Sequence, residues 1–284
     1  MCLYAHLVKA QDEHLTPDAE RCHELIELLS QAWTADREFV KVTSSADAIF
    51  APVVFAHVAH AIQLTRAVST LHRAGDGLVM MPLVRQVIEC AIRAVWLELY
   101  RGNVHAVVRE GFRERKNLLD SAVEAAWLAA SDSVVEDAHR ALEGESDGAT
   151  SGRSFQRICA ELEGGERHYA LYRLASALTH PGTDLVEHYI ERSEIATSGI
   201  GFVADPGLES MDAWLGITAQ HALVAVYAWD RVETGRPYRT SLRPWAEGFG
   251  VGRKRPGMTA IGFTASNKAE TRRRRAKKVA MRSS

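Results

Sequence analysis

The sequence lacks the covalent frameworks on which small extracellular domains depend. Its 284 residues hold four cysteines, and no two of them form a C-x-x-C pair. Isolated thiols supply neither a zinc knuckle nor a redox pair, and they are typical of a reducing compartment. We therefore expect a cytoplasmic protein with four buried, inert cysteines: Cys2, Cys22, Cys90 and Cys159.

Long apolar runs and targeting signals are also missing. The N-terminus has no basic start and no small-residue cleavage site, so we expect no signal peptide. The most apolar stretch, residues 48–64, is interrupted by Pro52, His57, His60 and Gln63. A membrane span needs about 20 apolar residues. This stretch therefore predicts a core helix and no contact with a membrane.

The motifs of several common enzyme classes are absent, namely the Gly-rich phosphate loop, the nucleophile elbow and the Rossmann fingerprint. Alternating runs that would indicate a sheet are absent as well. What is present is helical periodicity, with Pro and Gly between the apolar stretches. At 46% hydrophobic and 25% charged, the chain can bury a core. These features predict an all-α bundle of about six or seven helices in a single domain, residues 1–247.

The periodicity also predicts where the helices lie. Long helices are expected over residues 17–42, 52–74, 78–100, 104–130 and 208–234, and shorter ones over 131–144, 154–162 and 166–180. Residues 183–207 are ambiguous, and residues 195–203 fit either a brief strand or an irregular loop. After Gly235 the helical periodicity is lost.

The net charge of −2 conceals a strong asymmetry. Residues 251–284 hold eleven Lys and Arg against one Glu, which leaves 23 basic and 35 acidic residues in residues 1–250. Residues 248–284 also have too little apolar content to offset the entropy of ordering, so they predict a disordered basic tail. Such a tail contacts nucleic acid or an acidic surface. The acidic body argues against a broad nucleic-acid-binding face.

One polar pair is expected within an apolar helix face. At 100° per residue, Arg85 and Glu89 share a face with Leu78, Met81, Ile92 and Trp96. A buried ion pair is costly to desolvate and seldom adds net stability. Two interpretations follow: a core pair that fixes the helix register, or a site whose arginine is held by Glu89.

A second constellation lies just before Pro181. Tyr172, Arg173, Ser176 and His180 cover a polar arc of one helix, and Pro181 should place the imidazole at the helix exit. A hydroxyl, a guanidinium and an imidazole in one line can hold a phosphate and move a proton. The alternative is an exposed helix face that ends in an ordinary capping histidine.

These two motifs carry a resemblance to a known family. Arg85-x3-Glu89, together with Tyr172-x3-Ser176-x3-His180, resembles bacterial all-helical proteins of unknown function that carry both motifs on separate helices. The resemblance covers roughly residues 50–232. The family is in turn similar to HEPN domains, helical bundles that often dimerise.

Many HEPN domains are metal-independent ribonucleases with an Arg-x(4–6)-His motif, and Arg173-x6-His180 fits its outer limit. The resemblance implies that His180 transfers the proton and Arg173 stabilises the phosphate, with Ser176 and Tyr172 beside them and Arg85 and Glu89 in support. Arg66-x5-His72 fits the same spacing.

Metal chemistry has little support in the sequence. Glu20-x2-His23 and Glu136-x2-His139 match the Glu-x-x-His of di-iron bundles, but two such matches are close to chance and their inward Glu partners are not evident. His57 and His60 share a face, as core histidines do. We expect no metal site and no cofactor.

Two functions remain open. The expected one is a non-catalytic binding or oligomerisation module, which the acidic body favours. The alternative is a HEPN-like ribonuclease of the toxin or defence type, which the Arg173/Ser176/His180 line and the basic tail favour. RNA and a second copy of the chain are the corresponding partners.

Overall fold

The computed structural model of the protein is almost entirely helical, as the periodicity predicts. It describes residues 18–34, 42, 48–143, 152, 154–249, 251, 258–259 and 262–263. Ten α-helices fall within these residues, more than the six or seven expected. Eight of the ten have a counterpart among the predicted ranges, and the two without one, residues 183–186 and 239–248, are too short to show a clear apolar period.

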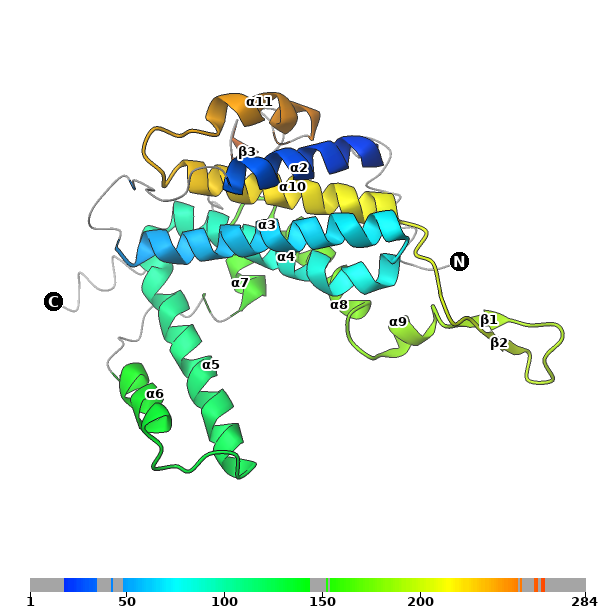
Figure 1. The fold of residues 1–284 in the computed structure, drawn as a ribbon, viewed down its shortest axis with the longest axis horizontal. Helices are drawn as coiled ribbons and strands as arrows, with labels where there is room; N and C mark the ends of the chain where they lie inside the picture. Colours follow the sequence, from blue (N-terminus) through cyan, green and yellow to red (C-terminus); the bar gives the residue numbers. More distant parts are fainter. Residues whose placement is uncertain are drawn as a thin grey trace.

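Four long helices form the body: α2 (Ala19–Thr34), α3 (Phe50–Ala74), α4 (Gly77–Leu99) and α10 (Met211–Asp230). Helix α10 lies against all three others, as Figure 1 shows. It is buried around nearly its whole circumference, which is typical of a helix at the centre of a core. The largest fully buried side chains include three tryptophans on α4 and α10: Trp96, Trp214 and Trp229.

The α3–α4 pair depends on a tight glycine turn. Gly75 has a φ of +87°, and its N–H bonds to the carbonyl of His72 at 3.1 Å, while Asp76 N–H bonds to that of Leu71 at 3.0 Å. This is the glycine-terminated helix end in which a left-handed residue satisfies the last carbonyls. Gly77 permits a close approach, since a Cβ there would lie 2.6 Å from that of Leu208.

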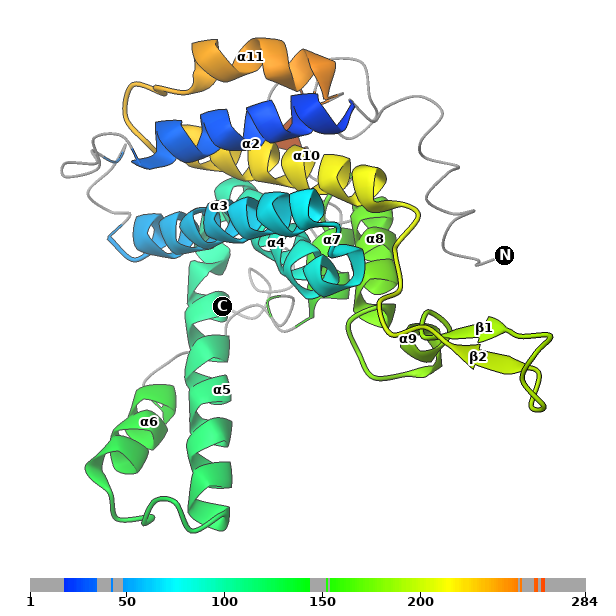
Figure 2. The same cartoon turned by 45° about the vertical axis from the view of Figure 1, so that its right-hand side comes forward.

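Two elements project from the body in both views (Figures 1 and 2). The first is α5 (Val104–Glu124), preceded by the 3-10 turn Arg101–Asn103 and covered on one side by α6 (Ser133–Glu143). The second is an antiparallel hairpin of β1 (Ile190–Arg192) and β2 (Ile200–Phe202), which follows α9 (Thr183–Val186). Residues 195–203 were expected to form either a brief strand or an irregular loop. The structure places the short strand β2 at their C-terminal end.

Helices α7 (Phe155–Ala160) and α8 (Gly165–Ala177) pack on the side of α4.

Several helices are shorter than the sequence predicts. Helix α5 ends at Glu124 and not near 130, because Ala126 has a φ of +57°, a left-handed conformation that no helix continues. Helix α2 is described as far as Thr34, and the predicted continuation over residues 35–41 lies outside the described residues. None of the described helices has the length and apolarity to cross a membrane.

The predicted loss of helical structure after Gly235 is wrong. Helix α11 (Arg239–Gly248) begins after buried Asp230, whose Oδ1 accepts a bond from Tyr238 N–H at 2.9 Å and so satisfies a free donor at the helix start. Leu242 and Ala246, one turn apart, bury the inner face of α11. Two apolar contacts on a ten-residue helix are too few for a periodicity signal.

The packed body also extends beyond the predicted boundary at 247, because Phe249 and Val251 are buried in the core. The chain then forms an antiparallel hairpin of two strands of two residues each, β3 (Met258–Thr259) and β4 (Gly262–Phe263). Strand β4 lies beside α10. The rest of the predicted basic tail lies outside the described residues.

Candidate functional site: a polar network between α4 and α8

The two polar motifs meet between α4 and α8. The Arg85 guanidinium donates from Nε to Ser176 Oγ at 3.0 Å and from a terminal nitrogen to the Tyr172 hydroxyl. It also lies over the Tyr172 ring, with 4.6 Å between Cζ and the ring centroid. Ser176 in turn donates to the Tyr172 carbonyl at 2.7 Å. Arg85 therefore ties the middle of α4 to two successive turns of α8.

Glu89 continues the network along α4. Its carboxylate lies 4.0 Å from Arg85 and, more closely, 2.9 Å from Arg93, which bonds it through both Nε and a terminal nitrogen. Arg93 also donates to the carbonyl of Gly152 at 3.4 Å. Two guanidinium groups thus share one carboxylate, and the group carries a net charge of +1.

The network is half-buried, with 24% of the Arg85 side chain and 16% of the Glu89 side chain exposed. At such depth an unpaired charge is costly, and each partner offsets the desolvation of another. The hydroxyls of Tyr172 and Ser176 accept bonds from Arg85, so they are occupied within the protein. This geometry favours the register-fixing interpretation over an open site.

Of the two residues assigned to catalysis by the resemblance, Arg173 lies elsewhere on α8 and His180 lies three residues beyond the end of the helix. Arg173 is exposed beside Tyr169, whose hydroxyl raises the pKa of the Arg173 guanidinium. His180 is exposed at the helix exit, and among the described residues its side chain has no hydrogen-bond or ion-pair partner. The structure thus brings together Arg85, Glu89, Tyr172 and Ser176, but leaves Arg173 and His180 outside their network.

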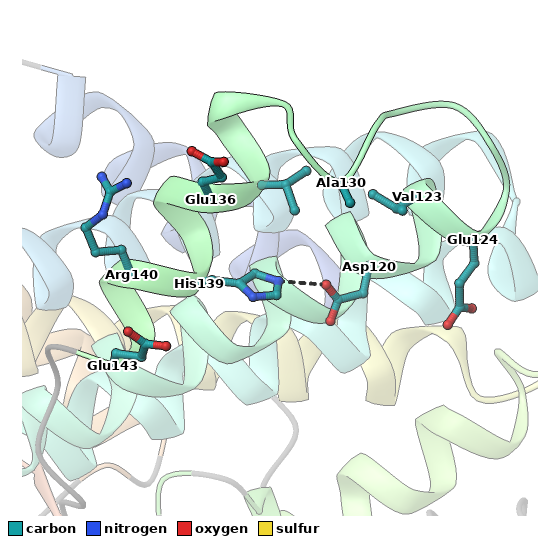
Figure 3. A pocket seen from close by; sticks show the side chains of 9 residues that line it. Asp120, Val123, Glu124, Ala130, Glu136, His139, Arg140 and Glu143 are labelled. Atoms are coloured by element: carbon teal, nitrogen blue, oxygen red, sulfur yellow. Dashed lines mark hydrogen bonds and ion pairs between the residues drawn. The ribbon is translucent and has the colours of Figure 1, made fainter.

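The histidine of the Glu136-x2-His139 motif has a partner on α5. Figure 3 shows the hydrogen bond that His139 donates to Asp120, beside Glu124, Glu136 and Glu143. These side chains line a hollow of about 540 Å³ between α5 and α6. The bond is 2.8 Å long. In the described part of the chain, no three His, Cys, Asp or Glu side chains gather as a metal site would require.

The three described cysteines are buried, as expected, and burial raises the pKa of each thiol: Cys22 to about 12, Cys90 to about 11 and Cys159 to about 12. Thiols with such pKa values stay protonated at neutral pH, so they are poor nucleophiles.

The sequence motifs did not point to a histidine pair between α8 and α10, in which His221 is buried and His168 is half-buried. His168 Nδ1 lies 3.0 Å from His221 Nε2, and His221 Nδ1 donates to the carbonyl of Ile217 at 2.7 Å. Burial lowers the pKa of His221 to about 4, and burial together with the neighbouring His221 lowers the pKa of His168. The pair is therefore neutral at physiological pH. Neither residue belongs to a recognisable motif.

The sequence analysis did not name Arg93 as a partner of Glu89, although the spacing of the two residues indicates it. It stands four residues after Glu89 on the same helix, the spacing at which a carboxylate and a guanidinium pair.

Fold and network together define an all-helical protein whose α4 is joined to α8 by a half-buried cluster of charged and hydroxyl side chains. The chain belongs to DUF5677, a family of unknown function, whose model matches residues 51–197, from α3 to the turn of the β1–β2 hairpin. No curated protein and no solved structure matches the chain.

The histidine pair predicts a pH-dependent stability. The unfolded chain takes up a proton at His221 as the pH falls through about 6.5, whereas the folded protein takes it up only near pH 4. The unfolded state binds more protons than the folded state between these two pH values. The free energy of unfolding is therefore highest above pH 6.5 and decreases by up to about 3 kcal/mol as the pH falls towards 4.

Urea unfolding from pH 7.5 to 4.5 measures this effect. His221→Gln should flatten the pH dependence, while the control His60→Gln, at an exposed position on α3, should follow the unmodified protein. An equal pH dependence in His221→Gln would show that the buried pair does not cause it.

Proposed function

We propose that the protein is a non-catalytic binding or oligomerisation module and that the β1–β2 hairpin is its contact surface. The observation that carries this proposal is the exposure of large apolar side chains on an element that projects from the body (Figure 2). The α4–α8 network supports it, because its polar groups bond to one another instead of facing a substrate.

The strand register places the apolar side chains on one face of the hairpin. Ile190 pairs with Phe202 and Arg192 with Ile200, and side chains two residues apart lie on the same face. Ile190, Ile200 and Phe202 are all exposed, Phe202 to 86%. An exposed apolar face of this kind is typical of an interaction surface.

An isolated two-stranded hairpin is marginally stable in water, so a surface that covers its apolar face would stabilise it. The projecting α5 carries further exposed apolar side chains, with Leu118 on the helix and Trp127, 83% exposed, just beyond its end. Aromatic side chains supply much of the binding energy at protein interfaces. We therefore assign the contacts of this module to its projecting elements.

Self-association through the hairpin can be tested by sedimentation. The mass of the full chain should rise from 31.4 kDa towards twice that value with concentration, and Phe202→Ser should raise the dissociation constant about thirtyfold, as expected for loss of a central aromatic contact. The matched control is Val79→Ser, which removes an exposed apolar side chain from α4. A full chain of monomer mass throughout, or unchanged association of Phe202→Ser, would contradict the proposal.

A second candidate function is a HEPN-like, metal-independent ribonuclease. Arg173 and His180 favour it, because both are exposed, Arg173 on α8 and His180 three residues beyond its end. A guanidinium and an imidazole that are both accessible are suited to binding a phosphate and transferring a proton. The basic tail, which lies largely outside the described residues, would add attraction to RNA.

This candidate predicts RNA cleavage in excess EDTA that leaves cyclic phosphate ends. His180→Ala and Arg173→Ala should each reduce the rate at least a hundredfold, because each removes a group needed in the transition state. His60→Ala, which removes an exposed histidine from α3, should cleave normally. If the unmodified protein leaves RNA intact, or if His180→Ala cleaves it equally well, the ribonuclease interpretation fails.

A further inference from the structure

Hydrogen bonds at both ends of the β1–β2 hairpin show which way its backbone groups point. Ser193 N–H donates to the carbonyl of Gly199, and Val203 N–H donates to that of Tyr189, each at 3.0 Å. Along an antiparallel ladder, hydrogen-bonded pairs alternate with pairs whose N–H and C=O groups point away from the partner strand. The residue pairs next to these two therefore direct their backbone groups outwards.

Ile190 and Arg192 are the outward-pointing residues of β1, because the register places them in such pairs, opposite Phe202 and Ile200. All of β1 is exposed, and no group of the described residues bonds to the outward N–H and C=O of either residue. Free donors and acceptors along a sheet edge are a template on which a further strand can add. Strand β1 also contains neither proline nor lysine, which commonly protect such edges.

The outer edge of β2 is less available. Ile200 N–H donates to the Ser198 hydroxyl oxygen at 3.3 Å, and the same hydroxyl donates to the Ile200 carbonyl at 3.3 Å. A side chain thus occupies one of the two outward-pointing residues of β2 and leaves only Phe202 to bond a neighbour. Figure 2 shows the hairpin extending away from the helical body. The edge that can accept a strand is therefore that of β1.

We propose that the outer edge of β1 binds an extended, basic segment of a partner protein as a third, antiparallel strand. This inference rests on the proposed role of the hairpin as a contact surface, and it names the chemistry of what the hairpin contacts. Backbone hydrogen bonds to Ile190 and Arg192 hold the segment, and its side chains determine which segments fit. A third strand also stabilises the hairpin, since two strands alone are marginally stable in water.

The side-chain pattern of the segment follows from the register. Its residues opposite Ile190 and Arg192 place their side chains on the apolar face of the hairpin. Ile200 and Phe202 lie on that face as well, so apolar side chains extend it. The residue between them lies opposite Glu191, on the other face, where a basic side chain pairs with the carboxylate. The segment therefore alternates apolar and basic residues.

The charge of the edge favours a basic segment over a second copy of the chain. Against the one guanidinium of Arg192, residues 187–194 hold three exposed carboxylates: Glu187, Glu191 and Glu194. If β1 paired antiparallel with its own copy in the register that joins Ile190 to Arg192, the Glu191 side chains of the two copies would lie opposite each other. Like charges directly opposite destabilise a strand pair, whereas lysine or arginine at that position stabilises it.

A fluorescein-labelled peptide of alternating valine and lysine probes the edge, with binding to the full chain measured by fluorescence anisotropy. We expect saturable binding. Methylation of the valine amide nitrogens should weaken it about tenfold, because in an antiparallel third strand the valines on the apolar face donate to β1. Methylation of the lysine amide nitrogens should leave binding unchanged, because these N–H groups point away from β1. Both methylated peptides carry the same charge, so electrostatic attraction alone affects them equally.

Substitutions in the chain test the same edge. Arg192→Pro removes an outward N–H but no bond between β1 and β2, and Arg192→Ala removes the same side chain while keeping the N–H. Arg192→Ala should therefore bind the peptide about fivefold more tightly than Arg192→Pro. Glu191→Lys should weaken binding several-fold by placing like charges opposite each other. The matched control Glu24→Lys, which makes the same change of charge at an exposed position on α2, should not.

Absence of binding to the unmodified chain would overturn the inference, and so would equal weakening by both methylated peptides or by neither. If Arg192→Pro disorders the hairpin, the methylated peptides on the unmodified chain decide the matter. Sedimentation without peptide tests the proposed self-association separately. A chain that dimerises but does not distinguish the methylated peptides contradicts only the binding edge, and a chain that distinguishes them but stays monomeric contradicts only the dimer.

Discussion

A guanidinium on the core helix needs partners, and this constraint shapes the side of the molecule that contains α4, α7 and α8. Arg85 lies on a helix that is otherwise largely buried, so leaving it unpaired would cost several kcal/mol. Glu89 alone does not satisfy it, because its carboxylate is closer to Arg93. The hydroxyls of Tyr172 and Ser176 accept the remaining hydrogen bonds of the Arg85 guanidinium and thereby fix α8 against α4.

The rest of the body follows from apolar burial around α10, and polar pairs determine how the outer helices join it. Asp230, the last residue of α10, accepts a bond from Tyr238 N–H at the start of α11. The pair His168–His221 joins α8 to α10, and the hydrogen bonds that run from His23 to Asp212 join α2, α3 and α10. Specific polar contacts of this kind are directional, so they select one arrangement among the many that would bury similar apolar area. The exposed apolar side chains on the hairpin and α5 are the surfaces to which we assign the contacts with partners.

The sequence predicted this architecture well where periodicity was long. Residues 52–74 and 78–100 were expected as helices and lie in α3 and α4, because their length and the Gly75 turn are unambiguous. Helix α11 was missed because Leu242 and Ala246 alone bury its face. The resemblance placed Arg85 in support of Tyr172, Ser176 and His180, and the structure joins Arg85 to the first two but leaves His180 outside. The pairs His168–His221 and His23–His72 could not be predicted, because they join residues about 50 positions apart with no shared motif.

The central claim is that the α4–α8 network is a structural clamp and not an open site. A double-mutant cycle with Arg85→Met and Tyr172→Phe, read as the free energy of unfolding in urea, tests it most directly. Because the two side chains are in direct contact, the account predicts a coupling energy of about 0.5–3 kcal/mol. Additive effects, with each single variant as stable as the unmodified protein, would show that these side chains are free to serve a ligand and would contradict it.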